Sequence, residues 1–364
     1  GYVSPGEWIY RQVEDTNVEY EKFLAGDFTF ITIAPDKQNE FRNLNESLSA
    51  EEQFQVLEYP SNSYAYVVWN QADPENPVNG RDENGQAADQ GYHPIFSDKL
   101  VRQAMAHAID VRAIIGTSPD ENGDGATGIL EGNGSLVTTH NHPGLSWVDP
   151  EQAPYAYDPV MALDLLEEAG WMDNDGDGLL ECNDCLYARE VDAAYNGTPF
   201  EFELLTNSGN NIREGVGETM TTQLDELGIT VDYQAIEFGT LVQVLLGQTY
   251  DGIIIGWSLG LPFDPDGRWA LGSTSDLVGS GFNTGSYYNA DLEAIWEAAV
   301  SVPGCDQEER AALYREAMNI LYEDQPYLWL YAANTMVAAQ PDVQNFDALP
   351  YNVDWNIDAW TIGD

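Results

Sequence analysis

Hydrophobic positions along the chain recur at two spacings, one typical of helices and the other typical of strands. Runs rich in aromatic and β-branched residues predict strands, most clearly YAYVVWN at residues 64–70. Apolar residues three and four positions apart predict helices with one buried face. The expected helices cover residues 17–25, 100–115, 158–169, 213–227, 241–246, 291–300 and 306–323, and the expected strands cover 27–34, 64–70, 229–236, 252–257 and 327–340. This alternation predicts an α/β fold with mixed sheets.

Capping signals place the ends of two of these helices. Ser97 is expected to cap the helix over residues 100–115. Asp158 is a good N-cap for the helix that follows, Pro159 suits its first turn, and Gly170 ends it. Residues 71–92 are rich in Asn, Asp, Gly and Pro, which predicts a surface loop.

An Asp-rich loop follows the helix that Gly170 ends, and its spacing matches a calcium-binding loop. Asp184 stands at position 12, where a bidentate Glu is usual, so one oxygen is lost there unless Glu181 at position 9 compensates. The alternative is an acidic surface turn in an acidic protein. We favour a structural Ca²⁺ ion. Its expected ligands are Asp173, Asp175, Asp177, Leu179 through its carbonyl group, Glu181 and Asp184.

A second stretch has the same spacing but weaker support. Its expected ligands are Asp120, Asn122, Asp124 and Glu131. Gly128 interrupts the stretch, and no apolar helices flank it, so a glycine-rich turn explains it equally well.

Two of the three cysteines, Cys182 and Cys185, form a C-x-x-C motif at the end of the first acidic loop. Four interpretations compete: a local disulfide, half of a zinc site, a redox pair and free thiols. Zinc would need two more ligands, and the only close histidine pair is His140 with His142. We favour a disulfide formed in an oxidising compartment.

Composition and charge narrow the class of protein. Hydrophobic residues make up 43% of the chain and aromatic residues 12%, which is typical of a folded protein. The net charge of −49, from 62 acidic and 13 basic residues, disfavours binding to nucleic acid or anionic membranes. Such a charge suits a salty or divalent-rich medium, or serves solubility alone.

The chain lacks the motifs of common enzymes and of membrane spans. It contains no G-x-S-x-G, H-E-x-x-H or P-loop sequence, so we expect no catalytic activity. No run of eighteen apolar residues is present. Because the sequence begins at Gly1 without a leader, we interpret it as a fragment of a precursor.

Six segments, in this order, resemble the peptide- and nickel-type (family 5) extracellular solute-binding proteins of ABC importers. They are FSDKLVRQAMAHAID (96–110), YDPVMALDLLEEAGW (157–171), LGITVDYQAIEF (227–238), YDGIIIGWSLGLPFDP (250–265), SYYNADLEAIWEAA (286–299) and EDQPYLWLY (323–331). Each segment alone is a weak signal, whereas six in order are specific.

The resemblance implies a two-lobed periplasmic-binding-protein-like fold of type II, with two crossing strands as the hinge. The chain then divides into residues 1–68, the middle of the first lobe; 69–333, a complete second lobe; and 334–364, which return to the first lobe. The opening part of the first lobe and a small extra domain would be missing, so the chain is interpreted as a C-terminal fragment.

The resemblance also implies a function. The protein would capture peptides or similar small solutes outside the cytoplasmic membrane and deliver them to the permease subunits of an ABC importer. It would act as an extracytoplasmic monomer, lipid-anchored through a missing N-terminus. The alternative is a calcium-stabilised extracellular binding or adhesion module that has kept the fold without transport.

The ligand site implied by the resemblance centres on the loop after Trp257. Family members usually carry an Asp three residues later, which pairs with the α-amino group of a peptide, but this chain has Gly260 there. Recognition of a free N-terminus is therefore in doubt. Arg102 is expected to be an ion-pair partner within its helix. The candidate ligand contacts are Trp257, Asp264, Asn283, Tyr287 and Tyr288, with core packing as the alternative for the aromatic residues.

Overall fold

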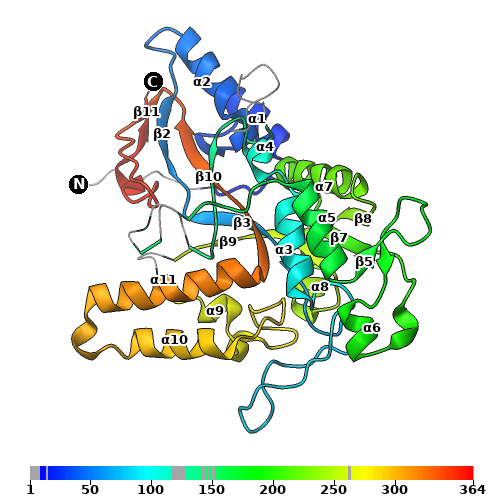
Figure 1. The fold of residues 1–364 in the computed structure, drawn as a ribbon. Helices are drawn as coiled ribbons and strands as arrows, with labels where there is room; N and C mark the ends of the chain where they lie inside the picture. The colour runs from blue at the N-terminus through cyan, green and yellow to red at the C-terminus, as the bar shows by residue number, and fades with distance from the viewer. Residues whose placement is uncertain are drawn as a thin grey trace.

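One mixed sheet crosses the molecule, in the strand order β1-β10-β3-β9-β7-β8, with β2 and β4 paired to β10 (Figure 1). The structure is a computed structural model that describes residues 9–13, 15–116, 128–141, 145, 147–148, 152–260 and 264–363. The strands of the sheet are β1 (Phe30–Ile33), β2 (Gln55–Pro60), β3 (Ser63–Trp69), β4 (Gly134–Leu136), β7 (Glu201–Asn207), β8 (Thr230–Ile236), β9 (Gly252–Ser258) and β10 (Tyr327–Ala339). Strand β7 runs parallel to both β8 and β9, and the other pairs are antiparallel.

Two small strand pairs lie apart from this sheet. Strand β5 (Trp171–Met172) pairs with β6 (Glu181–Cys182), and β11 (Val343–Gln344) pairs with β12 (Thr361–Ile362). The first pair closes the Asp-rich loop at its base.

Helices cover both faces of the sheet (Figure 1). They are α1 (Thr16–Leu24), α2 (Gln38–Ser47), α3 (Lys99–Ala108), α4 (Val111–Ile115), α5 (Pro159–Glu168), α6 (Leu186–Glu190), α7 (Asn211–Asp225), α8 (Phe238–Gly247), α9 (Arg268–Leu271), α10 (Ala290–Val300) and α11 (Gln307–Asp324). Single 3₁₀ turns occur at Pro35–Lys37, Ala193–Tyr195, Ser273–Ser275, Pro303–Cys305 and Ile357–Ala359. The mixed α/β class predicted from the sequence is confirmed.

Strand alternation divides the main core into two halves. On β3, Val67 lies in the cluster that packs against α3, α5 and α7, whereas its neighbour Val68 lies in the cluster that packs against α8, α10 and α11. Successive side chains of a strand point to opposite faces, so a strand covered on both sides becomes apolar throughout. A third cluster, which includes Phe23 and Phe41, joins α1 and α2 to β1.

Strand β10 belongs to both ends of the sheet. Its first half pairs with β3 and β4, and its second half pairs with β1 and β2. The register shifts between Trp329 and Tyr331, where the strand passes from one set of partners towards the other. Strand β2 leads into β3 through Ser61 and Asn62. The β2–β3 segment is therefore a second connection, beside β10, between the two ends of the sheet.

The predicted cap of the helix over residues 100–115 is wrong, and so is its continuity. Asp98 is the N-cap, since its side chain accepts a hydrogen bond from the Leu100 amide. The Ser97 hydroxyl instead donates to the carbonyl groups of Gln71 and His93. The backbone is extended at Ile109 (φ −111°, ψ 122°), and a separate helix, α4, then begins.

The elements that the sequence pattern missed include α2 and β7. Strand β7 lies between β8 and β9, and Leu204, Leu205 and Thr206 are buried in it. Its first residues alternate between exposed Glu201 and buried Phe202, which is the period of a strand. The two glutamates in this stretch obscured a signal that the alternation contained.

Candidate functional site

The carboxyl ends of β7 and β9 and the start of α7 meet at one edge of the sheet. Asn207 ends β7, and Trp257 is the penultimate residue of β9. Helix α7 begins four residues after β7 ends, with Asn210 as its N-cap. In open α/β sheets, ligands bind outside the carboxyl ends of parallel strands. A ligand site is therefore expected at this edge of the sheet.

Trp257 forms part of an aromatic surface there. Its ring lies 5.0 Å from that of Trp269 and 5.3 Å from that of Phe282, centroid to centroid, both in edge-to-face geometry. On its inner side it stacks on Tyr66 at 6.3 Å. Phe282 is 50% exposed, and the two tryptophans are partly buried. We call Trp257, Trp269 and Phe282 the aromatic platform.

Gly260 leaves room for the side chain that family members carry. It is exposed, and a Cβ atom built on it would have no neighbour within 4 Å among the described residues. Packing against the described residues therefore does not explain the lack of an acid at this position. Farther along, Asp264 is exposed, whereas Asp266 accepts hydrogen bonds from the Arg268 side chain, with an Nε to Oδ2 distance of 2.9 Å.

Two of the expected ligand contacts use their polar groups inside the protein. The Asn283 amide donates to the carbonyl groups of Gly272 (3.2 Å) and Tyr287 (2.8 Å). The Tyr287 hydroxyl donates to Asp324 Oδ2 at 2.6 Å, and burial raises the pKa of that hydroxyl far above its usual range. Both side chains thus hold the segment between α9 and α10 in place. Tyr288 is 46% exposed and stays free to meet a ligand.

Arg102 binds backbone carbonyl groups instead of the expected partner on its own helix. Its guanidinium donates to the carbonyl oxygens of Phe96 (2.7 Å), Ser97 (3.0 Å) and Asp324 (3.0 Å). Burial lowers the pKa of this guanidinium to about 10, so it stays charged at neutral pH. The residue joins the start of α3 to the end of α11.

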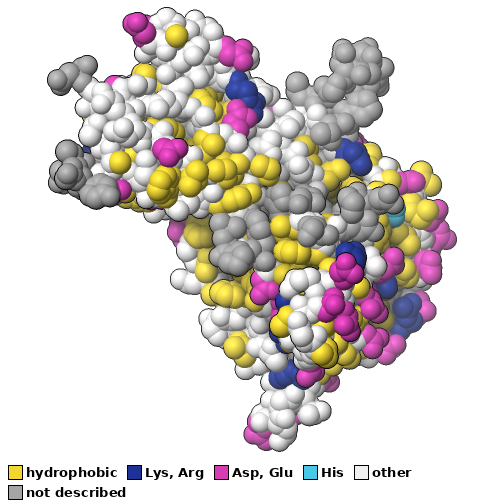
Figure 2. All heavy atoms as spheres, turned by 90° about the vertical axis from the view of Figure 1, so that its left-hand side faces the viewer, with side chains coloured by type: hydrophobic (Ala, Val, Ile, Leu, Met, Phe, Trp, Pro, Cys, Tyr) yellow, Lys and Arg dark blue, Asp and Glu magenta, His cyan; other side chains and the backbone are white. Residues whose placement is uncertain are grey.

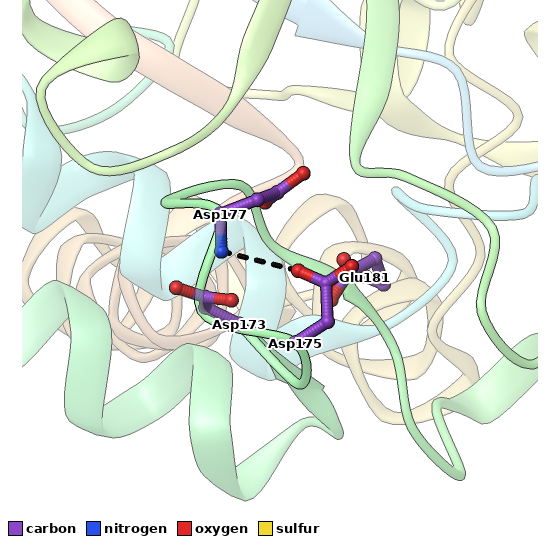
Figure 3. Close-up of side chains that lie close together, drawn as sticks. All are labelled: Asp173, Asp175, Asp177 and Glu181. Carbon is purple, nitrogen blue, oxygen red and sulfur yellow. Dashed lines mark hydrogen bonds between the residues drawn. The ribbon is translucent and has the colours of Figure 1, made fainter.

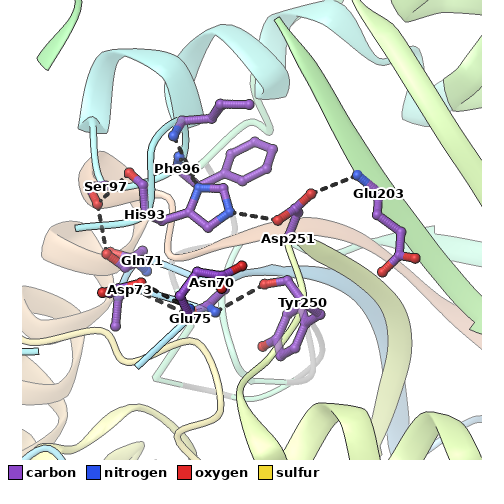
Figure 4. Close-up of polar contacts among 12 residues, drawn as sticks. Asn70, Gln71, Asp73, Glu75, His93, Phe96, Ser97, Glu203, Tyr250 and Asp251 are labelled. Carbon is purple, nitrogen blue, oxygen red and sulfur yellow. Dashed lines mark hydrogen bonds and ion pairs between the residues drawn. The ribbon is translucent and has the colours of Figure 1, made fainter. Parts of the chain in front are cut away.

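A buried histidine fixes the start of β9 (Figure 4). His93 Nδ1 accepts hydrogen bonds from the amides of Ile95 (3.1 Å) and Phe96 (3.0 Å), and its Nε2 donates to Asp251 Oδ1 at 3.0 Å. The other oxygen of Asp251 accepts from the Glu203 amide at 2.8 Å. Burial alone would raise the pKa of Asp251, but the hydrogen bonds from His93 and Glu203 outweigh it, and this pKa is lowered.

Four carboxylates of the first acidic loop converge. Each of Asp173, Asp175, Asp177 and Glu181 has an oxygen within 4.8 Å of one from each of the others (Figure 3). Asp184, the expected ligand at position 12, is not in this group; its backbone amide donates to Asn196 Oδ1. The exposed cluster could hold a metal ion.

Backbone amides shape the same loop. Asp173 accepts hydrogen bonds from the amides of Gly176 (2.6 Å) and Gly178 (3.0 Å), and Asp175 accepts from the Asp177 amide at 3.1 Å. These turns fix the backbone of the loop that carries the carboxylates. Leu179, whose carbonyl group was also expected to bind the ion, directly follows Gly178.

A disulfide joins Cys182 to Cys185, with Cα atoms 5.3 Å apart. It leaves neither sulfur free for zinc. His140 is buried elsewhere, with its Nε2 3.0 Å from the Pro265 carbonyl oxygen, and His142 lies outside the described residues. Cys305 is exposed and free.

Most of the second acidic stretch is not described. Asp120, Asn122 and Asp124 lie outside the described residues. Glu131 is exposed and has a positive φ of 48°.

The sequence analysis passed over Arg213. This residue lies in the first turn of α7, and its Nη1 donates to Asn207 Oδ1 at 2.7 Å. The available signal was the rarity of basic residues, because the chain has only 13 and this one lies three residues after the N-cap of a long helix.

A face rich in apolar atoms accompanies these features. Figure 2 shows several groups of exposed hydrophobic side chains on the side that looks left in Figure 1, with acidic side chains dense at its lower right. Exposed apolar surface of this kind is a feature of binding sites.

Comparisons with known proteins bear on the family and the fold. A family model described as bacterial extracellular solute-binding proteins, family 5 Middle, matches residues 2–277. The oligopeptide-binding protein AppA of Bacillus subtilis is 27% identical over 359 residues, which cover 96% of this chain and 55% of that protein. The glutathione-binding protein GsiB of Salmonella typhi is 23% identical over 263 residues, which cover 70% of this chain and 43% of that protein.

Solved structures give the same fold. AppA of Bacillus subtilis in complex with a nonapeptide matches with a TM-score of 0.74 at 25% identity, over 97% of this chain and 59% of that one. NikZ of Campylobacter jejuni in complex with Ni(L-His) matches with a TM-score of 0.72 at 21% identity, over 96% and 61%. The chain thus spans a little over half the length of these relatives.

Proposed function

Because this chain belongs to the family 5 bacterial extracellular solute-binding proteins, we propose that it forms the ligand-binding part of an ABC importer receptor. The receptor would capture peptides or similar small solutes outside the cytoplasmic membrane and deliver them to permease subunits. The family binds solutes and is not enzymatic, in agreement with the lack of catalytic motifs. The proposed cargo follows the peptide that AppA holds in its complex.

The aromatic platform is the observation that carries this proposal. A half-exposed Phe282 beside two partly buried tryptophans is costly to leave in water, and it lies beside the end of β9, outside the carboxyl edge where α/β folds bind ligands. Apolar side chains of a solute would cover it. Trp257, Asp264 and Tyr288 stay candidate contacts, whereas Asn283 and Tyr287 would support them from behind.

Closure around the solute would use the two connections between the ends of the sheet. Strand β10 and the β2–β3 segment are continuous between them, so bending there would move one end relative to the other. In this proposal residues 1–68 and 334–364 belong to one lobe and residues 69–333 to the other.

We also propose that the acidic loop binds Ca²⁺ and that the ion is structural. Hard oxygen donors in a D-x-D-x-D-G arrangement are what calcium prefers. The converging carboxylates support Asp173, Asp175, Asp177 and Glu181 as ligands. The ion would fix the loop between β5 and β6, next to the disulfide.

Location follows from the proposed role. We infer an extracytoplasmic protein, lipid-anchored in its full-length form. Across the described part of the chain, no helix combines the length and hydrophobicity needed to cross a membrane.

A second function is favoured by one observation, the glycine at position 260. A calcium-stabilised binding or adhesion module would need no group for a peptide N-terminus, and Gly260 offers none. Genes for a permease and an ATPase beside the full-length gene would favour transport over this alternative.

Calorimetric titration of the full-length protein with a mixed peptide library tests the main proposal. We expect saturable heat. Phe282→Ala should weaken binding about tenfold, because it removes roughly 1.4 kcal/mol of apolar contact. Phe238→Ala is the matched control, since Phe238 is 52% exposed on α8 and has no part in the platform. Absence of heat with every peptide pool would show the peptide assignment to be incorrect.

A further inference from the structure

A turn at residues 130–133 joins the two proposed lobes of the molecule. One side of this turn is fixed to the second lobe. Leu130 is fully buried in the core cluster that packs against α3, α5 and α7. The Gly132 amide donates a hydrogen bond to the Ile115 carbonyl oxygen of α4 at 2.7 Å. The turn therefore moves with α4 and with the core of the second lobe.

The other side of the same turn is bound by α2, which belongs to the proposed first lobe. Asn39 Nδ2 donates to the Glu131 carbonyl oxygen at 2.9 Å. Arg42 Nη2 donates to Asn133 Oδ1 at 3.0 Å. Asn133 Nδ2 in turn donates to the Pro35 carbonyl oxygen, just before α2, at 3.0 Å. We call these three hydrogen bonds the α2 brace.

The α2 brace lies where β10 passes from one end of the sheet to the other. Ala333 of β10 still pairs with β4, whereas Asn334 pairs with β2. The Asn334 amide also donates to the Asn133 carbonyl oxygen at 2.9 Å. Because Phe41 packs α2 into the cluster around β1, a bend of β10 at this point would move α2 relative to the turn at 130–133 and stretch the brace.

Burial makes the hydrogen bonds of the Asn133 side chain costly to break. Asn133 is 4% exposed, and the first lobe engages both ends of its amide group. Separation of α2 from the turn would leave a buried donor and a buried acceptor without partners. Glu58 of β2 holds Arg42 in position, since its carboxylate accepts from Arg42 Nε at 2.9 Å and from Nη2 at 3.0 Å. This charge-assisted pair orients the guanidinium towards Asn133.

We propose that the α2 brace holds the two lobes at the angle of this structure and limits their rotation about the crossing strands. This inference rests on the proposed function, because it concerns the hinge of the same receptor. Asn133 and Arg42 have no part in the aromatic platform. They are therefore positioning residues, which act on binding through the angle between the lobes.

Double electron–electron resonance on the full-length protein tests the proposal in the absence of solute. One spin label is attached to Cys305, an exposed free thiol of the second lobe. The other is attached to the variant Glu21→Cys, at an exposed position of α1 outside the brace. We expect one narrow distance distribution with the brace intact. Asn133→Ala should broaden it about twofold, because the lobes then populate several angles.

Asn45→Ala is the matched control for a lost pair of hydrogen bonds on α2. The Asn45 side chain donates to the Phe54 carbonyl oxygen and accepts from the Phe54 amide, so both of its bonds stay within the first lobe. This variant should keep the narrow distribution.

Asn39→Ala is a milder second variant, which serves if Asn133→Ala does not fold. Asn39 is half-buried, and its replacement removes one bond of the brace, so it should broaden the distribution less than Asn133→Ala. If the folded variants of the brace keep the distribution of the unmodified brace, these contacts only support α2 locally, and the inference is overturned.

Addition of the mixed peptide library separates this inference from the proposed function. Closure on a solute should shift the mean distance with the brace intact. The absence of a shift, together with the absence of heat in calorimetry, would show that the peptide assignment is wrong. The comparison between the intact brace and Asn133→Ala is made without solute, so it still decides whether the brace fixes the angle.

Discussion

Replacing Asp175 by Asn is the sharpest test of the calcium assignment. The Asp175 side chain accepts a single backbone hydrogen bond, from the Asp177 amide, and an Asn oxygen can still accept it. The variant therefore keeps the turn and removes one charge. Two unit charges 4.8 Å apart in water repel by about 0.9 kcal/mol. The variant should therefore be slightly more stable than the unmodified protein without calcium, whereas its calcium-bound form loses a charged ligand.

The expected shift of the melting temperature follows from the linkage between calcium binding and folding. Calcium at one hundred times its dissociation constant stabilises the folded state by about 2.7 kcal/mol. With an unfolding entropy of about 2.1 cal/mol/K per residue, 364 residues give a melting shift of about 3.5 °C. A tenfold weaker site at the same calcium concentration keeps about 1.4 kcal/mol, or about 2 °C.

Differential scanning fluorimetry with added Ca²⁺ or chelator measures both shifts. Asp82→Asn is the matched control, because Asp82 also accepts backbone hydrogen bonds in an exposed loop, from Asn84 and Gln86. It should respond to calcium as the unmodified protein does. The reasoning is refuted if millimolar Ca²⁺ leaves the melting temperature unchanged, or if Asp175→Asn keeps the full shift.

Three further predictions concern other sites. Gly260→Asp should fold normally, because no described residue would contact a Cβ atom at this position. In calorimetry it should improve binding of peptides with a free amino terminus over N-acetylated ones; equal affinities would contradict this. The pKa of Asp251 is lower in the folded protein than its unfolded value of about 3.9, so this carboxylate stabilises the fold above that value, and the stabilisation is lost as the pH falls through the folded pKa. The free energy of unfolding in urea should therefore depend less on pH in that range for Asp251→Asn than for the unmodified protein. Parallel pH dependences of the two would rule this out. Removing the disulfide by Cys182→Ser with Cys185→Ser should cost about 2 kcal/mol by chain entropy, against no change for the exposed Cys305→Ser.

Hydrophobic periodicity was sufficient to predict the bounds of elements whose packing is decided by the burial of apolar side chains. The strands β3, β9 and β10 lie within one residue of the predicted ranges, since continuous apolar runs have little alternative to a covered sheet. Strand β8, at the end of the strand order, is equally close to its predicted range but consists of exposed and half-buried residues, most of them in alternation. The Asp158 cap and the end at Gly170, which has a φ of 87°, also follow local rules. Long-range contacts overrode such rules at Ser97, whose hydroxyl bonds to Gln71 instead of starting a helix.

Only part of the candidate site could be predicted from the sequence, because long-range contacts decide the rest. Trp257 can be found because its motif is local, and the acidic loop because its spacing is. Asn283 and Tyr287 look like ligand contacts in sequence, yet their partners Gly272 and Asp324 come from outside the motif that contains them. No local pattern reveals which polar side chains will form hydrogen bonds inside the folded protein.

The end of β9 shows how one strand end can present a candidate ligand surface on one face and serve packing on the other. Gly256 and Trp257 are neighbours, so their positions face opposite sides of the sheet. Trp257 joins the aromatic platform on one side, and the vacant position at Gly256 makes room for the Arg213 guanidinium on the other. A solute bound at the platform would therefore meet β9 from one side only, whereas the other side of the strand end anchors the start of α7 through Arg213 and Asn207.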